Sequence, residues 1–295
     1  MILRLEAGRL SLGLLPALGG AIAWLDWQRG SGAPVPLLRR ADAAAIASGD
    51  PSRLACFPLV PFANRIAGSR FTFGGCEHHL PINRPPNPMA IHGSSFQAPW
   101  EVAEHGAGMA RLVHRHRAAH APFRYRAEQV FSLGEDGLRI ALSVTHEGDA
   151  PMPYGIGLHP WFPRPPGTRL RLGAGLMLPP DADLLPTHPV PAPPPLAAGV
   201  AAEALAPFDA CLAGWDGQAT ITWPDLGCGV AVAAGGAFGN AHLFVPPDRL
   251  VLCVEPVSHV PNVHNRPDLN RLGSLAVLEP GHSLRGEVTL SPVEA

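Results

Sequence analysis

Two histidines and one glutamate lie in three short apolar segments and could carry acid–base chemistry together. The segments are AIHG with His92, GLHPWF with His159 and VEPVSH with Glu255. Histidine can gain or lose a proton near neutral pH, where a glutamate of ordinary pKa is ionised. A cleft that held both groups could move protons between two oxygens of one substrate, with no metal or nucleophile required.

The three residues lie far apart in the chain, so only the tertiary fold could bring them together. Glu255 stands in the apolar run LVLCVEPV, where burial of a carboxylate without a partner would be costly. We therefore expect Glu255 to have either a functional partner or a structural arginine. Because acid–base work of this kind needs no extreme tuning, we expect pKa values close to the ordinary ones for His159 and Glu255.

The elements that would position these residues are expected to be strands. The chain contains 35 prolines and 32 glycines along its whole length, which cut it into segments too short for long helices. A period of two, with Tyr125, Ala127, Gln129 and Phe131 on one face, is typical of a strand. A turn at 134–137 follows, which predicts a hairpin with the strand LRIALSV.

Similar patterns predict hairpins at 70–80, 100–116 and 218–233, and two strands joined at Gly19-Gly20. The alanines at 41–47 favour a short helix, and the proline-rich stretch 186–199 favours an extended surface loop. With 295 residues and 46% hydrophobic composition, the chain can bury a sizeable core. We predict an all-β fold of antiparallel sheets in which residues 1–295 form a single domain.

The charge of the chain argues against nucleic acid and membranes as partners. Its formal net charge is −2, its pI is about 6.7 and 16% of its residues are charged. These values give no basic footprint for nucleic acid or an anionic bilayer, and no apolar run reaches the roughly 18 residues of a spanning helix. No lysine occurs, which excludes Schiff-base chemistry and the lysine of phosphate-binding loops.

The cysteines and the N-terminal region indicate the compartment. Five cysteines, odd in number and without a Cys-x-x-Cys pair, predict neither a disulfide framework nor a thiolate zinc site. The uncharged stretch 10–25 is interrupted by Pro16 and Gly19-Gly20, unlike a signal-peptide core. We expect a cytoplasmic protein whose ligand is a small neutral molecule.

The chain resembles the aldose 1-epimerase (galactose mutarotase) family in five ordered segments. They are FPLVPFANRIAGSRFTFGG at 57–75, the stretch from LPIN to AIHG at 80–93, GIGLHPWF at 155–162, FDACLAGWDG at 208–217, and VEPVSH. The segments are specific only as a set. The resemblance implies a large antiparallel β-sandwich of the galactose mutarotase-like supersandwich type, a sugar-sized cleft, no cofactor, and interconversion of the α and β anomers of a free aldose.

The resemblance also assigns roles. It makes Glu255 the base that removes the proton of the C1 hydroxyl, and His159 the acid that protonates the ring oxygen. Ring opening, rotation about C1–C2 and reclosure would give the other anomer. The residues that would bind the sugar are Arg65, His92, Asp209, Asn64 and Trp161. Two departures from the family pattern, Ser94 and the segment PNVHN at 261–265, are expected at the rim of the site.

Simpler structural roles remain open for three of these residues. Arg65 could merely pair with a carboxylate. Asp209 could cap a turn, with Asp216 as its nearest rival for the binding role, and Trp161 could be a core aromatic.

Three other functions also remain open. A metal-dependent β-sandwich would draw its ligands from His114, His116, Glu255, His259 and His264. A hexose-phosphate 1-epimerase would bind phosphate through Arg84, Arg266 or Arg271. A non-catalytic carbohydrate-binding protein could keep the same cleft. The partner that we expect is a small aldose, and the sequence leaves a homodimer open.

Overall fold

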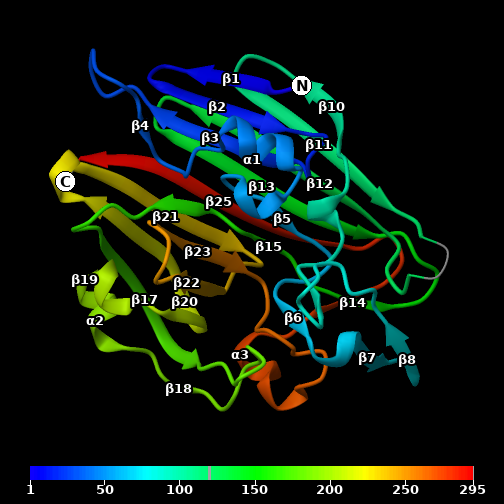
Figure 1. Cartoon of the computed structure of the whole chain (residues 1–295). Helices are drawn as coiled ribbons and strands as arrows, with labels where there is room; N and C mark the ends of the chain where they lie inside the picture. The colour runs from blue at the N-terminus through cyan, green and yellow to red at the C-terminus, as the bar shows by residue number, and fades with distance from the viewer. Residues whose placement is uncertain (119–120, 295) are drawn as a thin grey trace.

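The chain folds into antiparallel sheets, as predicted (Figure 1). The computed structural model describes residues 1–118 and 121–294; His120, expected on a solvated strand or turn, lies outside them. The largest sheet contains 15 strands and forms the main layer. Its hydrogen-bonded path runs through β10 (Glu101–His105), β11 (Met109–His116), β12 (Tyr125–Gly134), β13 (Gly137–His146), β25 (Ser283–Glu294), β21 (Cys228–Gly236), β20 (Phe208–Trp223), β22 (Asn240–Val245), β23 (Val251–Val257), β15 (Gly157–Leu158) and β5 (Pro58–Leu59).

Other strands extend or cover this sheet. Those paired beside the main path are β16 (Trp161–Pro163) on β23, β17 (Arg169–Leu178) on β20, and β18 (Val190–Pro191) and β19 (Val200–Ala201) on β17. A second, four-stranded sheet comprises β1 (Leu3–Ala7), β2 (Leu10–Leu15), β3 (Ala21–Trp27) and β4 (Val35–Pro36). Two-stranded sheets pair β6 (Arg65–Ile66) with β9 (Ala90–Ile91), β7 (Arg70–Phe73) with β8 (Cys76–His79), and β14 (Met152–Tyr154) with β24 (Ala276–Leu278).

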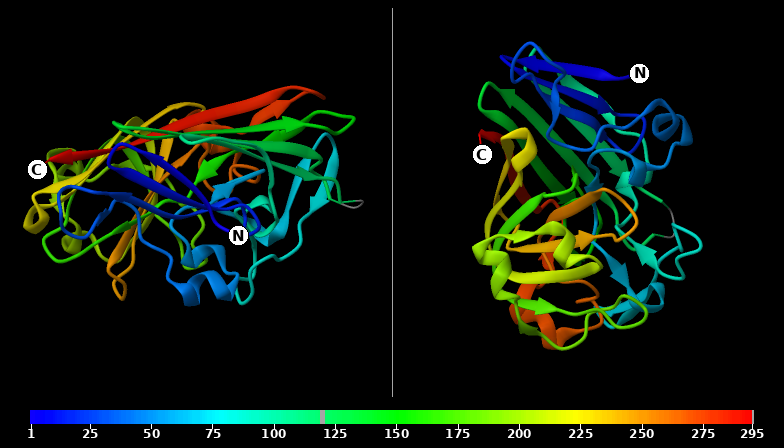
Figure 2. Two further views of the ribbon diagram at one scale, coloured as in Figure 1. Left: turned by 90° about the horizontal axis from the view of Figure 1, so that it is seen from above. Right: turned by 60° about the vertical axis from the view of Figure 1, so that its left-hand side comes forward.

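The four-stranded sheet packs its apolar face on the large sheet. Figure 2 shows the blue N-terminal strands beside green strands of the large sheet, and β1 and β2 contact β12. Leu5 and Leu12 from one layer and Leu138 and Ile140 from the other belong to one core of fully buried side chains. This apolar burial is the dominant favourable contribution to folding.

The predicted hairpins are all present. β12 and β13 pair from Tyr125 opposite His146 to Gly134 opposite Gly137. The shared face predicted for Tyr125, Ala127, Gln129 and Phe131 is the buried one, and it includes the polar Gln129. Hairpins also form at β7 with β8, β10 with β11, and β20 with β21, and β2 and β3 meet at Gly19-Gly20.

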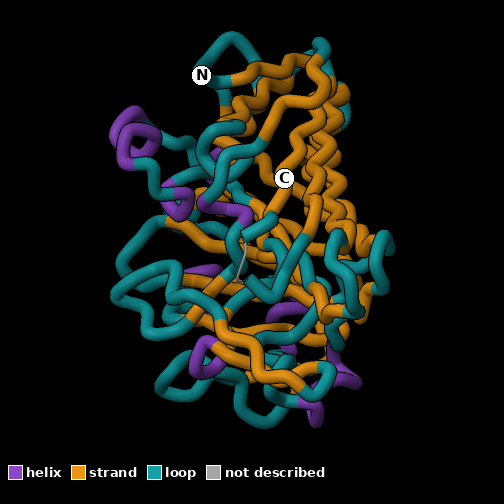
Figure 3. Tube along the Cα trace, turned by 90° about the vertical axis from the view of Figure 1, so that its right-hand side faces the viewer, coloured by secondary structure: helices purple, strands orange, loops and turns teal. Residues whose placement is uncertain are grey.

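Helices are short and lie at the periphery of the strands (Figure 3). The predicted helix at 41–47 is α1 (Ala43–Ser48), which Asp42 caps and which Gly49 ends with a left-handed φ of 65°. The prediction of an extended loop at 186–199 was wrong in part, because this stretch contains β18 and the helix α2 (Pro194–Ala198). Proline is compatible with the first turn of a helix, and Leu196 is buried at 1% exposure.

The third α-helix in the described part of the chain, α3 (Asn270–Gly273), is a single turn. Across 1–118 and 121–294, no helix combines the length and the apolar character that a bilayer crossing demands. All five cysteines are free thiols, as predicted.

Candidate active site

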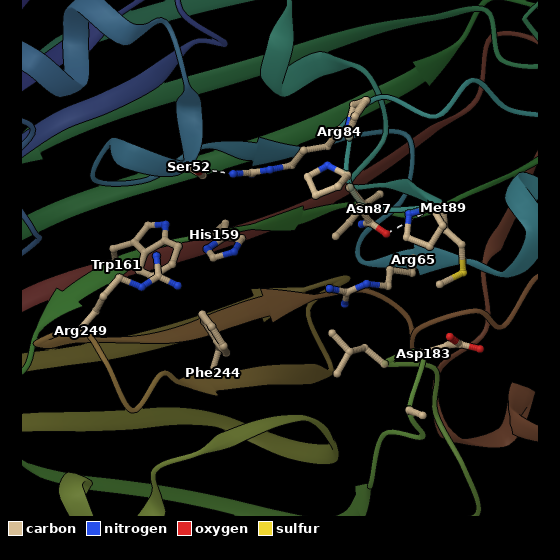
Figure 4. Close-up of a pocket in the computed structure, with 16 residues that line it drawn as sticks. Ser52, Arg65, Arg84, Asn87, Met89, His159, Trp161, Asp183, Phe244 and Arg249 are labelled. Atoms are coloured by element: carbon tan, nitrogen blue, oxygen red, sulfur yellow. Dashed lines mark hydrogen bonds between the residues drawn. The ribbon is translucent and has the colours of Figure 1, made fainter.

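A cavity of about 520 Å³ opens beside β16 and β22, and three of the predicted site residues line it. These are Arg65, His159 and Trp161, which Figure 4 shows around one hollow with Phe244. The loop 84–89 and the loop 182–184 complete its wall. A volume in this range suits a small-molecule ligand.

His159 and Glu255 form a buried pair, of which His159 lines this cavity. β23 is buried along its whole length, and Glu255 lies within it. His159 follows β15, which pairs with β23 through Gly157 opposite Val257, and its backbone N–H donates to the Phe57 carbonyl at 2.9 Å. Nε2 of His159 lies 3.2 Å from Oε1 of Glu255, with the two residues 7% and 3% exposed. The fold thus gives Glu255 the partner that its apolar surroundings require.

The expectation of ordinary pKa values for this pair was wrong. Burial raises the pKa of Glu255 to about 8, although the positive charge of His242 opposes the shift. Burial also holds the pKa of His159 well below its usual range, and the charges of His242 and Arg39 add to this effect. Desolvation acts against the charged form of either group, and the depth at which each group lies cannot be read from the order of residues.

The pair holds one proton when both groups are neutral. An ionised Glu255 beside a protonated His159 contains the same number of protons. The two forms therefore differ only in whether the proton sits on the carboxylate or on the imidazole, across the 3.2 Å between them. The geometry allows this exchange without a proton from solvent.

His242, which was not among the predicted site residues, links the pair to Asp209. His242 lies on β22 directly opposite Glu255 on β23, and its Nε2 is 2.6 Å from Oδ1 of Asp209. Burial disfavours the imidazolium, but hydrogen bonds to Asp209 and Cys211 and the nearby carboxylates raise the pKa of His242 to about 10. Burial by itself would raise the pKa of Asp209, but the hydrogen bond to His242 and the positive charges of His242 and Arg65 together lower it. His242 is therefore a buried cation between two carboxylates.

The only signal for His242 in the sequence was its place in NAHLFV, the strand before the one that carries Glu255. A single histidine in an apolar run is weak evidence for a site.

Asn64 and His92 connect two of the segments that carry the family resemblance. The Asn64 N–H donates to His92 Nδ1 at 3.1 Å, and the His92 N–H donates to the Asn64 carbonyl at 3.0 Å. Both residues have a left-handed φ, 58° and 61°, which asparagine and histidine adopt more readily than most. Asn64 Oδ1 accepts the backbone N–H of Arg65 at 2.8 Å. This network directs Arg65 to the cavity wall, beside the charges of Asp209 and Glu255.

Trp161 combines the two roles that the sequence left open. It is 3% exposed and packs in an apolar cluster, yet it lines the cavity. Its ring stacks on His159 with centroids 5.0 Å apart and planes at 17°. The guanidinium of Arg39 lies 4.3 Å from the same ring, an arrangement typical of a cation–π contact.

Some sequence expectations are not met at the cavity. Asp216 is exposed and its Oδ1 accepts the Gln218 N–H at 2.9 Å, so Asp209 alone joins the site. Ser94 was expected at the rim, but its Oγ lies 2.8 Å from the hydroxyl of Tyr125, away from the cavity lining. In the PNVHN segment, Oδ1 of Asn262 accepts the backbone N–H of Ala67 at 3.0 Å. Ala67 directly follows β6, the strand that carries Arg65.

The histidines considered as metal ligands do not form a cluster. Nε2 of His259 accepts the Ala63 N–H at 3.0 Å and its Nδ1 donates to the Val260 carbonyl at 2.8 Å, so both nitrogens are used. Within the described parts of the chain, the potential ligand atoms that approach one another within 4.8 Å belong to His159, Cys253 and Glu255. Burial raises the pKa of the Cys253 thiol well above its usual value, and a neutral thiol is a poor metal ligand.

Comparison with known proteins agrees with this architecture. The sequence model of the aldose 1-epimerases matches residues 1–291. The chain belongs to the aldose 1-epimerase family. Among curated proteins of similar sequence, the uncharacterized protein YphB of Escherichia coli (strain K12) is 33% identical over 277 residues, which cover 86% of this chain and 88% of YphB. Galactose mutarotase of Mus musculus is 64% identical over a stretch of 31 residues, 10% of this chain and 8% of the mouse protein.

Solved structures share the galactose mutarotase-like fold. A crystal structure from Escherichia coli K12, provisionally named an aldose 1-epimerase, has a TM-score of 0.88 at 31% identity and covers 100% of this chain and 99% of its own. A galactose mutarotase-like protein from Clostridium acetobutylicum has a TM-score of 0.87 at 20% identity, with 99% and 95% covered. The fold class implied by the aldose 1-epimerase resemblance is thus confirmed.

Proposed function

We propose that this member of the family is an active aldose 1-epimerase that interconverts the α and β anomers of an aldose. The observation that carries the proposal is the buried pair of His159 Nε2 and Glu255 Oε1, 3.2 Å apart beside a cavity of about 520 Å³. Mutarotation requires one group to take a proton from the C1 hydroxyl and another to give a proton to the ring oxygen. A pair that shares one proton supplies both groups.

The catalytic cycle begins with Glu255 ionised and His159 protonated. Glu255 takes the proton of the C1 hydroxyl, His159 gives its proton to the ring oxygen, and the bond between C1 and the ring oxygen breaks. The open-chain aldehyde rotates about C1–C2. On reclosure, the hydroxyl that contains the former ring oxygen attacks C1 and returns its proton to His159. Glu255 gives its proton to the aldehyde oxygen, and the starting state is restored. Atoms and protons balance over the cycle.

The binding roles are part of the same proposal. Arg65 and Trp161 line the cavity, which supports contacts of their guanidinium and indole with the sugar. Asp209 accepts a hydrogen bond from a sugar hydroxyl while it holds His242. Asn64 and His92 act through the network that fixes Arg65. Because Nδ1 of His92 accepts a hydrogen bond, the proton of the neutral ring is on Nε2, and this Nε2–H donates to the sugar.

The decisive experiment follows the optical rotation of freshly dissolved α-glucose and α-galactose, in dilute buffer with a chelator. Wild-type protein should accelerate the approach to anomeric equilibrium. Glu255→Gln, which keeps the side-chain shape but cannot take the proton, should abolish the acceleration while its circular dichroism spectrum stays unchanged. Full activity in Glu255→Gln would reject the assignment of the base, and loss of activity with the chelator would favour a metal-dependent enzyme.

The setting of the enzyme is also proposed. The match to one family model over residues 1–291 supports a single domain. Free cysteines throughout support a cytoplasmic location, where thiols stay reduced. A homodimer is compatible with this proposal, and light scattering of the purified protein would test it.

A further inference from the structure

The cavity carries more positive charge than the acid–base pair uses. Its charged lining comprises three arginines, Arg65, Arg84 and Arg249, and one carboxylate, Asp183. The positive charge of Arg65 is compensated by the nearby acidic groups of Asp209 and Glu255. The other two arginines remain, so the charge at this cavity differs from the net charge of the whole chain, on which the expectation of a neutral ligand rested.

Arg84 and Arg249 gather with Arg39 around Ser52 and Trp161, and we call these three residues the arginine cluster. Arg84 Nη2 donates to the Ser52 hydroxyl, and Arg39 Nη2 donates to the Ser52 carbonyl at 2.7 Å. Arg39 and Arg249 lie 4.3 and 5.3 Å from the centroid of the Trp161 ring. Figure 4 shows Arg84 extended toward Ser52 and Arg249 beside Trp161.

Acidic neighbours neutralise this cluster only weakly. Asp50 lies 3.5 Å from Arg84 and is 42% exposed, and Asp248 lies 3.8 Å from Arg249 and is 77% exposed. Exposed pairs at such distances contribute little, because water screens them. The hydrogen bonds of the Arg39 guanidinium go to the carbonyls of Ser52 and Leu54. Burial, and then the nearby charge of Arg249, lower the pKa of Arg39 to about 10.

The chemistry of a pyranose relates this cluster to one end of the sugar. The ring oxygen is bonded to C5, and C5 carries the terminal carbon C6. If His159 protonates the ring oxygen, as the proposed function requires, a group on C6 lies on the His159 side of the ring. Trp161 stacks on His159 there, Arg39 and Arg249 lie over the Trp161 ring, and Arg84 reaches Ser52, to which Arg39 also donates.

We propose that the substrate is an aldose with an anionic group on its terminal carbon, a phosphate or a carboxylate, bound by Arg84 and Arg249. This inference rests on the proposed function for the orientation of the sugar. A guanidinium fork matches the paired oxygens of both anions, and the hydrogen bonds are charge-assisted. Arg39, which lies 4.3 Å from the centroid of the Trp161 ring and does not line the cavity, adds to the positive charge at this end of the site.

The backbone that carries Arg249 is fixed before any ligand binds. Arg164 is 5% exposed, and its Nη2 donates to the carbonyls of Pro246 at 2.8 Å and Arg249 at 2.6 Å. Its Nε donates to the Val251 carbonyl at 3.1 Å. This clamp holds the connection between β22 and β23 in place, so less conformational entropy is lost on binding.

The test compares anomerisation of glucose, glucose 6-phosphate and glucuronate by exchange NMR at low salt. Wild-type kcat/KM should favour at least one anionic sugar over glucose by about tenfold or more, the scale of one charge-assisted hydrogen bond. Arg84→Gln and Arg249→Gln should each lower kcat/KM for that sugar about tenfold and for glucose no more than about twofold. The control Arg171→Gln removes an exposed arginine outside the cavity and should change neither.

The outcomes separate this inference from the proposed function. Equal turnover of all three sugars, unaffected by Arg84→Gln, would overturn the anionic substrate and leave the epimerase in place. A preference for glucose 6-phosphate alone, or for glucuronate alone, would identify the anion. If no sugar is turned over, calorimetric titrations still decide: tighter binding of an anionic sugar that Arg84→Gln weakens supports the anion site, and equal or absent binding overturns it.

Discussion

His242 and Glu255 face each other across the antiparallel pair β22 and β23, and this pairing connects the proposed base to Asp209. Nε2 of His242 lies 2.6 Å from Asp209 Oδ1, and its positive charge lowers the pKa of Glu255 against the effect of burial. We infer that His242 is a positioning residue that sets the charge state of the base.

Replacement of His242 by glutamine should therefore shift the pH dependence of the enzyme as well as slow it. Without the cation, the pKa of Glu255 rises further, so the alkaline limb of kcat/KM should move to higher pH by about one unit. We expect kcat/KM at neutral pH to fall roughly 10- to 100-fold. His146→Gln, a change at a buried histidine bound to Tyr154, is the control. A uniform loss with no shift of the limb would indicate a purely structural role.

The pH profile of the wild type should decline above about pH 8. Glu255 is the last group of the pair to lose its proton, with a pKa of about 8, and above that pH no proton remains for the ring oxygen. On the acid side, activity should fall only when the pair takes up a second proton, well below the usual pKa of histidine. The profile of kcat/KM between pH 4 and pH 10 checks this prediction. A rate that rises through pH 8 would mean that another group supplies the acid.

Glu255→Gln should be more stable than the wild type in alkaline solution. The folded-state pKa of Glu255, about 8, lies above the ordinary value of 4.5, so the folded form binds a proton that the unfolded form releases between these pH values. Stability from this group is therefore full below about pH 4.5 and is lost as the pH rises through 8. Glutamine does not titrate, so we expect a gap of a few kcal/mol in the free energy of unfolding by pH 9.

Urea unfolding of both proteins at pH 5, 7 and 9 measures that gap. Parallel stability curves over this range would show that Glu255 does not change its protonation on unfolding.

Gly155→Ala should destabilise the fold and displace residues that support the site. A Cβ at Gly155 would collide with the imidazole of His259, whose Nε2 accepts the Ala63 N–H at 3.0 Å just before Asn64. Overpacking of this kind typically costs roughly 1–3 kcal/mol. We expect a lower melting temperature and a reduced kcat/KM. Gly235→Ala, where the added methyl meets open space, should leave both nearly unchanged.

Local elements of this fold could be predicted from sequence, because each hairpin has its own pattern. The alternation that begins at Tyr125 gives one buried face, and Gln129 fits that face because its side-chain amide donates to the Gly20 carbonyl at 3.0 Å. The order of strands was not predictable. β25, the last strand, lies between β13 and β21, and only contacts between distant parts of the chain determine this place.

The candidate site was predictable where a residue type alone restricts the chemistry, as for Glu255 and His159. Their pKa shifts were not, because these depend on the depth of burial and on a cation from another strand. His242 was missed for the same reason: its charge exists only because the fold places Asp209 beside it. Arg249 likewise became notable only through its contact with the Trp161 ring.

The acid–base pair and its arginine neighbours differ in how freely evolution can alter them. Glu255 and His242 are fixed by strand register, and an insertion of one residue within β22 or β23 would turn each following side chain to the opposite face. Arg84 and Arg249 stand on connections outside these strands, where insertions are tolerated. Descendants of this chain can therefore acquire new sugars by changes in loop length, while the machinery that opens the ring is inherited intact.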